Sequence, residues 1–392
     1  MTKKVAIVVQ RYGIEINGGA EYHARLIAEK LSKYVDIEVF TSTAIDYVTW
    51  KHHYNKSSEL INGIKINRYR VAKEREPEIF GKIQKKIYDE EHSLEDEIKW
   101  IEEEGPLLPD MITDIERREN EFEHIIFFSF RYYHSYYGVK TFINKSILVP
   151  TAEHDEVLYL RLFKDFFNLP KAIIYNSVEE KIIIEKIMNN VDVLSDIVGV
   201  GSEIPENFYP DSFRDKFNID GKYFVYIGRL DENKGVPQVL DYYLRLLREK
   251  EADFTLVLMG KSVIEIPEHK NIKYIGFVTN QEKFDGLYGA EFLIIPSQYE
   301  SLSMVSLEAW ALGKPVVANG KTEVLQGQCK RSNAGLWYEN YSEFKEIILL
   351  LLKDEKLKSK MGVNGIEFFK KNYSWSVIEN KYLNIFKQLE KK

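Results

Sequence analysis

Two cationic residues, each beside a glycine, follow a short apolar run. Arg229 comes after Gly228, and Lys234 stands five residues further on, before Gly235. The run YFVYI (223–227) is expected to be a buried strand, so both cations would lie on the loop at its carboxyl end. Arg can grip a phosphate with two donors, and Lys supplies a mobile point charge. The pattern is typical of an anion site, although solvated cations at a helix start would give the same letters.

A pair of glutamates follows the apolar run FLII (292–295), which is also expected to be a strand. Glu300 would lie in the loop after it, and Glu308 in the second turn of a helix over about 302–312. Free N–H groups at a helix start bind anions, and a carboxylate further along can accept hydrogen bonds from two ribose hydroxyls. Two surface glutamates are the plain alternative. The residues with free N–H groups would be Ser303, Met304 and Val305.

The first half of the chain offers weaker candidates. Gly18 and Gly19 precede an expected helix, and their backbone could approach a ligand closely, although any tight turn uses glycine. His154 follows the apolar run ILVP (147–150) and could equally be an ordinary loop histidine. These residues would lie at the carboxyl ends of strands, where ligands of such sheets bind.

An aromatic segment, RYYHSYY (131–137), follows another expected strand end. Sugar rings stack on aromatic side chains, so Arg131, Tyr132 and Tyr133 could form a platform for an acceptor. A buried aromatic helix is the favoured alternative.

The elements that would position these residues alternate between strand and helix. The apolar run VAIVV (5–9), a helix over 20–31 and the strand VDIEVF (35–40) form a βαβ unit. We therefore predict an α/β fold with two doubly wound parallel sheets. Further strands are expected at 125–130, 147–150, 172–176, 223–227, 254–259, 272–275, 292–295 and 315–318.

A change of texture near residue 200 suggests the boundary between two domains. Prolines follow the segment IVGVGSEI (197–204), as in a linker. Within the first domain, residues 74–124 form a charged helical insertion. Its helices are expected to pack on the sheet; a lid or membrane-facing patch around Lys82, Lys85 and Lys86 is the alternative.

Composition excludes several classes of protein. The 392 residues are 44% hydrophobic and 29% charged, so disorder and small disulfide scaffolds are excluded. A net charge of −7 argues against general nucleic-acid binding. The single cysteine, Cys329, permits neither an intrachain disulfide nor a Cys-based zinc site, which fits a reducing compartment.

Targeting and metal motifs are also missing from the sequence. The longest uniform apolar run is 347–352, and the start, Met1 to Gln10, lacks a signal-peptide pattern, so a cytoplasmic location is expected. There is no Gly-x-Gly-x-x-Gly, Walker A, Gly-x-Ser-x-Gly or His-Glu-x-x-His pattern. No Asp-x-Asp pair is present, so a metal site for a nucleotide sugar is not supported.

Taken in order, several segments resemble one family. The chain is similar to GT-B glycosyltransferases of glycosyltransferase family 4, the retaining family, of the bacterial surface-polysaccharide type. The resemblance runs almost end to end, and the order and spacing of its segments make it specific. The segments are GGAE (18–21), GRLDENKG (228–235), LMG (258–260), YIGFV (274–278), EAWALGKPVVA (308–318) and YSWSVIENKY (373–382).

The resemblance implies a role for each candidate on the donor side. Arg229 and Lys234, beside Gly228, match the cations that hold the donor diphosphate. Glu308 matches the carboxylate that binds the ribose hydroxyls, and Glu300 the one beside the donor sugar. The backbone of Phe277 and Val278 falls where the base is held.

The resemblance also implies roles in the first domain. His154 matches a histidine near the C6 hydroxyl of the donor sugar and the reaction centre, and Gly18 and Gly19 match a loop touching diphosphate and acceptor. One departure stands out: relatives often have Glu-Gly-Phe-Gly where this chain has Glu-Ser-Leu-Ser (300–303). The serines narrow the space around the donor sugar.

The implied architecture is two Rossmann-like domains facing each other across a cleft. They would be an acceptor-side domain over 1–199, a nucleotide-sugar domain over 200–372, and a helix over 373–392 that crosses back to the first domain. The implied activity is metal-independent, cofactor-free retaining transfer from a nucleoside-diphosphate sugar to a glycan, lipid-linked or other hydroxyl acceptor, in cell-surface polysaccharide or glycoconjugate synthesis. Peripheral membrane contact is a further hypothesis. A catalytically silent nucleotide- or glycan-binding partner and a nucleotide-sugar epimerase are the alternatives.

Overall fold

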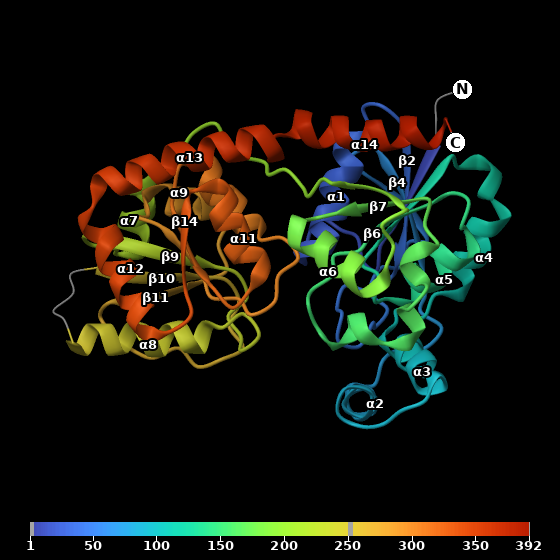
Figure 1. Cartoon of the computed structure of the whole chain (residues 1–392), viewed down its shortest axis with the longest axis horizontal. Helices are drawn as coiled ribbons and strands as arrows, with labels where there is room; N and C mark the ends of the chain where they lie inside the picture. The colour runs from blue at the N-terminus through green and yellow to red at the C-terminus, as the bar shows by residue number, and fades with distance from the viewer. Residues whose placement is uncertain (1–3, 250–253, 392) are drawn as a thin grey trace. The chain divides into compact units, whose positions relative to one another are not determined.

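The chain forms two compact units in a computed structural model (Figure 1), which describes residues 4–249 and 254–391. The first unit contains residues 1–200 together with 378–392, and the second contains residues 201–377.

The first unit is built on an eight-stranded sheet. Its strands are β1 (Lys4–Val8), β2 (Asp36–Ser42), β3 (Ser58–Ile61), β4 (Ile64–Tyr69), β5 (His124–Phe128), β6 (Ser146–Val149), β7 (Ala172–Tyr175) and β8 (Leu194–Ile197). They lie in the order β3-β4-β2-β1-β5-β6-β7-β8, and all neighbours are parallel except the hairpin β3–β4. Its helices are α1 (Gly19–Leu31), α2 (Pro77–Asp89), α3 (Leu94–Glu104), α4 (Pro109–Arg117), α5 (Tyr133–Thr141) and α6 (Val178–Met188), with short 3₁₀ turns η1 (Glu119–Glu121), η2 (Glu156–Tyr159), η3 (Arg161–Phe163) and η4 (Phe166–Asn168).

The second unit is built on a six-stranded, fully parallel sheet. Its strands are β9 (Lys222–Ile227), β10 (Phe254–Met259), β11 (Ile272–Gly276), β12 (Leu293–Ile295), β13 (Val316–Asn319) and β14 (Gly335–Tyr338), in the order β11-β10-β9-β12-β13-β14. In Figure 1, α8 and α9 lie on opposite sides of this sheet. Its helices are α7 (Pro210–Phe217), α8 (Val236–Glu249), α9 (Asn280–Gly289), α10 (Met304–Ala311), α11 (Glu323–Ser332), α12 (Tyr341–Lys353) and α13 (Glu355–Tyr373).

The strand order of each sheet reverses at one place. In the second unit the strands follow the doubly wound order 3-2-1-4-5-6, so the order reverses between β9 and β12. In the first unit it reverses between β1 and β5. Loops after the two central strands diverge there, which leaves room for a ligand at the carboxyl ends of the strands. The prediction of a doubly wound α/β fold with two parallel sheets is confirmed, with one sheet in each unit.

The strands that the sequence did not reveal lie at the edges of the sheets or, for β4, next to one. These are the hairpin β3–β4, β8 and β14. In β3, exposed and half-buried residues alternate, and in β8 every residue is half-buried. Both strands therefore lack the continuous apolar run of a buried parallel strand. Edge strands are covered on fewer sides, and their short polar sequences resemble loops.

The charged segment 74–124 folds into α2, α3 and α4. Trp100 and Ile101 of α3 and Met111 and Ile115 of α4 are buried in the core of the first unit. In α2 only Ile87 is buried, so most of that helix is exposed. Figure 1 shows α2 and α3 beside each other at the rim of this unit.

The end of the chain packs on the first unit through α14 (Trp375–Leu389). The hydroxyl of Tyr34 donates to Glu379 Oε2 at 2.9 Å, and the ring of Phe386 stacks on His124 with centroids 5.0 Å apart. Among the described residues, no helix combines the length and apolar composition that a membrane crossing needs. In the second unit, burial raises the pKa of the Cys329 thiol to about 12.

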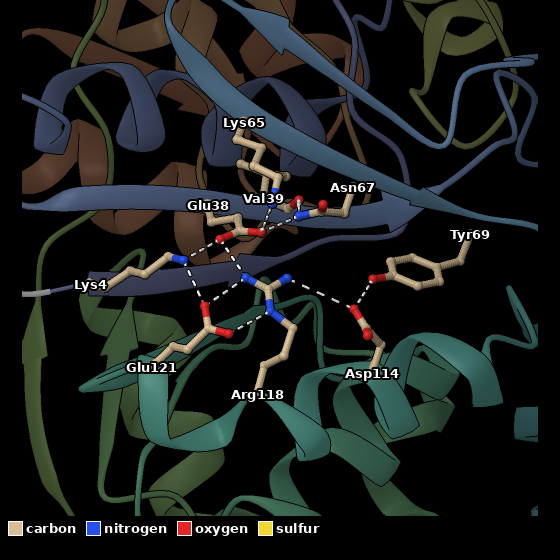
Figure 2. Close-up of polar contacts among 9 residues, drawn as sticks. All are labelled: Lys4, Glu38, Val39, Lys65, Asn67, Tyr69, Asp114, Arg118 and Glu121. Carbon is tan, nitrogen blue, oxygen red and sulfur yellow. Dashed lines mark hydrogen bonds and ion pairs between the residues drawn. The ribbon is translucent and has the colours of Figure 1, made fainter.

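A buried carboxylate, Glu38 on β2, organises a charge network in the first unit (Figure 2). Its oxygens receive Lys4 at 2.6 Å, Lys65 at 3.0 Å and Arg118 at 2.8 Å. Burial alone would raise the pKa of Glu38, but the hydrogen bonds from these cations and from Asn67 lower it well below its usual range. The network therefore ties β1, β2 and β4 to the chain just after α4.

Replacing the buried carboxylate of this network tests its contribution to stability. Glu38→Gln leaves three cations facing a neutral amide, so we expect a loss on the order of 3 kcal/mol at pH 7. Because the folded-state pKa of Glu38 is lowered, its contribution is present above the unfolded pKa of about 4.3 and is lost as the pH falls through the folded pKa. The difference from wild type should shrink in acid, as measured by calorimetry across pH.

Glu121→Gln is the matched control, because Glu121 shares Arg118 and Lys4 with Glu38 but its side chain is 45% exposed. Exposed pairs are worth about 1 kcal/mol or less, so this variant should lose much less stability. Equal losses in the two variants would contradict the special weight of the buried group.

One glycine in the second unit, Gly235, allows two loops to approach closely, and a second, Gly276, shares its backbone conformation without such a contact. Gly235 has φ +67°, and a Cβ there would lie 2.2 Å from the carbonyl oxygen of Pro296, in the loop after β12. Gly276 has a similar φ of +72°, but a Cβ there would meet nothing within 4 Å. The loop after β9 thus touches the loop after β12 at a point where only glycine fits.

These glycines separate backbone strain from steric conflict. We expect Gly276→Ala to cost about 1–2 kcal/mol, because alanine is strained in the left-handed region. Gly235→Ala should cost clearly more, because its methyl group must also push the Pro296 carbonyl away. The melting temperatures of the two variants separate backbone strain from steric conflict. Equal destabilisation would show that the loops move apart at no cost in free energy.

Candidate functional site

A buried aspartate organises the two cations after β9. Asp231, which is 7% exposed, pairs with Arg229 through the guanidinium Nε, and its Oδ1 accepts from the backbone N–H of Lys234 at 2.7 Å. Gly228 lies at the strand end with φ +151°, and its N–H donates to the carbonyl of Met259 at 3.0 Å. The loop is therefore preorganised, with both positive charges held near the strand end.

The loops after β9 and β12 are joined by charge. Lys234 Nζ lies 2.8 Å from Glu300 Oε1, and the side chains of this pair are 32% and 14% exposed. The N–H of Gln298 donates to the carbonyl of Asn233 at 3.3 Å, so the backbones also meet. Because β9 and β12 are neighbours where the strand order reverses, the contact lies at the carboxyl edge expected to bind a ligand.

Helix α10 begins just after this contact. The sequence predicts a helix over about 302–312, whereas α10 spans Met304–Ala311. Ser303 is its N-cap, with extended backbone (φ −85°, ψ 97°), and its hydroxyl accepts from the N–H of Ser306. Ser303 therefore precedes the helix, and Met304 and Val305 form the first turn, where N–H groups have no partner within the helix.

Glu308 lies on α10 and is almost fully buried. Its side chain is 5% exposed, and Oε1 accepts from Lys283 Nζ at 2.6 Å. Its other oxygen, Oε2, is buried and has no hydrogen-bond partner among the described residues. A buried acceptor left unpaired costs about 1–3 kcal/mol, so such an atom is a marked feature of the site.

The predicted base-binding segment lies at the end of β11. Phe277 is 73% exposed, and Val278 precedes Thr279, which caps α9. Thr279 and Glu282 form a reciprocal capping box at the start of that helix. The helix that begins here is the one that carries Lys283 to Glu308.

In the first unit, Gly18 and Gly19 lie at the start of α1. Gly18 is the N-cap, and a Cβ there would lie 2.2 Å from Glu21 Oε2, whereas Gly19 has open space around its α-carbon. Glu21 is buried and paired with Arg11, whose Nε donates at 2.8 Å. A Cβ at Gly18 would thus displace the carboxylate of the buried pair, while Gly19 leaves backbone accessible.

His154 lies in the segment after β6 and is exposed, with Nε2 at 2.8 Å from the Tyr159 hydroxyl. The turn before it is unusual: Thr151 has φ +49°, and its hydroxyl donates to that of Ser129, which has φ +68°. Non-glycine residues in this conformation are uncommon and gather at functional sites. Both lie at the carboxyl ends of neighbouring strands.

A buried glutamate supports the segment that bears His154. Glu180 on α6 is 1% exposed, and it accepts the N–H of Ala152 at 2.6 Å and that of Asn176 at the end of β7. Burial raises the pKa of Glu180 to about 8, against these hydrogen bonds. This carboxyl group therefore ties the strand ends of β6 and β7 together.

The predicted acceptor platform is only partly available. Tyr133 is 8% exposed and packs on Tyr137 with ring centroids 4.5 Å apart, so α5 is a buried aromatic helix at this point. Arg131 pairs with Asp155 at 3.0 Å, and Tyr132 is half-buried. Tyr133 is therefore a core residue and not a stacking surface, in agreement with the favoured alternative of a buried aromatic helix, whereas the roles of Arg131 and Tyr132 stay predictions.

A group able to hold a metal ion lies elsewhere in the first unit. Glu123, His124 and Glu390 have ligand atoms within 4.8 Å of one another, in the part of the chain that the structure describes. They stand where β5 begins, at the amino end of the strand, and each has other interactions. This position is at the opposite edge of the sheet from His154.

Within the second unit, the structure joins Lys234 after β9 to Glu300 after β12, just before the start of α10. Glu308 lies on α10 itself and contacts Lys283. Gly18, Gly19, His154 and Arg131 belong to the first unit. Sequence reasoning missed three supporting residues: Asp231, Lys283 and Glu180. Asp231 could have been found, because an aspartate three residues before Lys234 is typical of a side-chain-capped turn. Nothing in the sequence links Lys283 to a carboxylate 25 positions later.

Comparison with known proteins finds a family that resembles most of the second unit. Residues 210–368 match the family Glycosyl transferases group 1. An uncharacterized glycosyltransferase of Methanocaldococcus jannaschii is 29% identical over 172 residues, 40% of this chain and 45% of the relative. D-inositol 3-phosphate glycosyltransferase of Corynebacterium efficiens is 24% identical over 187 residues, 43% of each chain. The match thus spans slightly less than half the length of these relatives.

Solved structures match the fold over nearly the whole chain. Sucrose-phosphate synthase from Thermosynechococcus elongatus superposes with a TM-score of 0.71 at 17% identity, covering 99% of both chains. HepE of Anabaena in complex with UDP-glucose superposes with a TM-score of 0.67 at 14% identity, covering 99% of this chain and 100% of the other. Residues 210–368 are therefore similar to the family Glycosyl transferases group 1, in a chain whose two parallel-sheet α/β units have the GT-B fold.

Proposed function

We propose that this chain is a retaining, metal-independent glycosyltransferase of family 4. It would move a sugar from a nucleoside-diphosphate sugar to a hydroxyl acceptor. The observation that carries the proposal is the joining of Lys234 to Glu300 at 2.8 Å, beside Arg229 and ahead of the α10 N-terminus. Cations for a diphosphate, a carboxylate for a sugar and a carboxylate for a ribose thus occupy one edge of one sheet.

The site offers electrostatic stabilisation of the leaving group. Negative charge develops on the diphosphate as the bond to the sugar breaks, and preorganised cations lower the energy of that state. Asp231 holds Arg229 and the Lys234 backbone before any ligand arrives. An ammonium has three donors, so Lys234 can hold Glu300 and a phosphate oxygen together.

Retention would follow if the acceptor attacks the sugar carbon on the face from which the nucleoside diphosphate leaves. The leaving oxygen can then take the proton of the acceptor hydroxyl, so no nucleophile from the protein is needed. Glu300 would orient the donor sugar, and His154 of the first unit would contact its C6 hydroxyl. The relatives that match include enzymes named for transfer to small and polymeric acceptors, which supports the reaction class.

Thermal stabilisation by nucleotides tests the proposal. Purified protein in EDTA should be stabilised by one of UDP, GDP or dTDP, by about 2.7 kcal/mol at a hundred times the Kd. Lys234→Ala should remove most of this shift and slow sugar transfer by about 10²-fold, on the scale of losing one preorganised donor to developing charge. Product anomeric configuration, read by NMR, checks retention.

Lys345→Ala is the matched control. Lys345 of α12 also belongs to the second unit, and its Nζ lies 2.8 Å from a carboxylate oxygen of Glu249 on α8. This variant should bind nucleotide and transfer sugar as wild type does. Full activity in folded Lys234→Ala protein, or nucleotide binding only when a divalent metal is added, would contradict the assignment.

We also propose that the acceptor is a lipid-linked or membrane-proximal glycan of the cell surface, reached from the cytoplasmic face. Helix α2 exposes Ile79 beside Lys82 and Lys85, while Lys86 pairs with Asp96 at 2.7 Å. Such a surface suits anionic lipid. The protein should sediment with phosphatidylglycerol vesicles at low salt. The double variant Lys82→Glu/Lys85→Glu should sediment with them to a smaller extent. Absence of binding to the vesicles would overturn the membrane hypothesis alone.

A further inference from the structure

Lys283 and Glu308 form a pair just beneath the surface of the second unit. The ammonium lies 2.6 Å from Glu308 Oε1, with the two side chains 18% and 5% exposed. Lys283 belongs to none of the sequence motifs. Its described ion pair is with Glu308, whereas Arg229 pairs with Asp231 and Lys234 with Glu300. The other oxygen of Glu308 is buried without a hydrogen-bond partner in the described part of the chain.

The position of Lys283 is set by the start of α9. The Thr279 hydroxyl accepts the N–H of Glu282 at 3.2 Å, and Glu282 Oε2 accepts the N–H of Thr279 at 2.8 Å. This box fixes the first turn of α9, so the next residue, Lys283, projects from a rigid element. α9, labelled in Figure 1, begins at Asn280, two residues after the half-buried Val278 and three after the exposed Phe277.

The asymmetry of the carboxylate has a chemical meaning. A carboxylate has two oxygens that accept hydrogen bonds, and Lys283 occupies one of them. The unpaired oxygen gains a hydrogen bond only from a donor that the protein itself does not supply. A sugar hydroxyl is such a donor, and its oxygen can in turn accept from an ammonium.

We propose that Lys283 is a positioning residue that makes this site select ribonucleotides over deoxyribonucleotides. It holds Glu308 by Oε1 and leaves Oε2 to accept a hydroxyl of the nucleoside ribose. Without the lysine, the buried carboxylate loses its only described cation, and nothing fixes which oxygen meets the ligand. The proposal rests on the proposed function, since it assumes that the second unit binds a nucleoside diphosphate.

The test compares ribose and deoxyribose ligands on matched variants. UDP and GDP are titrated against their 2′-deoxy and 3′-deoxy forms by calorimetry, using wild type, Lys283→Met and Lys283→Arg. Wild type should bind a ribose form about tenfold or more tightly than at least one deoxy form, the value of a buried acceptor left unpaired. In Lys283→Met the ratio should fall to about threefold or less, and Lys283→Arg, which keeps the charge, should restore part of it.

Lys216→Met controls for the loss of an ion pair on α9. Lys216 of α7 pairs with Glu282 of α9, but the Lys216 side chain is 59% exposed. No contact between Lys216 and Glu308 is found among the described residues. Lys216→Met should keep the wild-type ratio of ribose to deoxyribose affinity. The double variant Lys283→Met/Glu308→Gln should bind the ribose form as tightly as Glu308→Gln alone, because Lys283 acts only through Glu308.

The outcomes separate the two proposals. If wild type binds UDP or GDP but Lys283→Met discriminates as well as wild type, the role of Lys283 is overturned and the proposed function stands. Equal binding of ribose and both deoxy forms by wild type also overturns the role of Lys283. If wild type binds dTDP but neither UDP nor GDP, the role of Lys283 is overturned and the proposed function stands, because dTDP is a deoxyribonucleotide. If wild type binds none of the three nucleotides, the proposed function fails. A purely structural lysine would lower the melting temperature without changing the ratio.

Discussion

The contact of Lys234 with Glu300 is the interaction on which the rest of the candidate site depends. It joins the loops after β9 and β12, two neighbouring strands that lie far apart in sequence. The close approach at Gly235 and Pro296 makes that contact sterically feasible. Asp231 fixes the cation side, and Ser303 starts the helix on the carboxylate side. Position within the sheet and charge thus reinforce one another.

Buried carboxylates serve two purposes in this chain. Glu38 receives cations on both of its oxygens, so its network is complete and its value is stability. Glu308 has a cation on one oxygen only, and the second is left unpaired among the described residues. A saturated network has nothing to offer a ligand. The incomplete one keeps part of its bonding capacity for a molecule that arrives later.

The central strands and the charged loops could be predicted from sequence, because buried parallel strands are continuous apolar runs and cations after them are easily seen. Edge strands such as β3 and β8 lacked that signal. Asp231 stood inside a recognised motif without a role, and Lys283 and Glu180 act through contacts made only by folding. The aromatic run 131–137 left two interpretations open, because a buried and an exposed aromatic helix have the same composition, and Tyr133 follows the favoured, buried one.

The single cysteine has a practical consequence for observing motion. Cys329 is buried, and its raised pKa keeps it a thiol at neutral pH, where only thiolates react rapidly. Maleimide reagents should therefore ignore the native chain. One cysteine introduced on the surface of each unit would then carry a fluorescent dye of its own, without first removing a background site. Energy transfer between the dyes would report in real time whether the units move when a nucleotide binds.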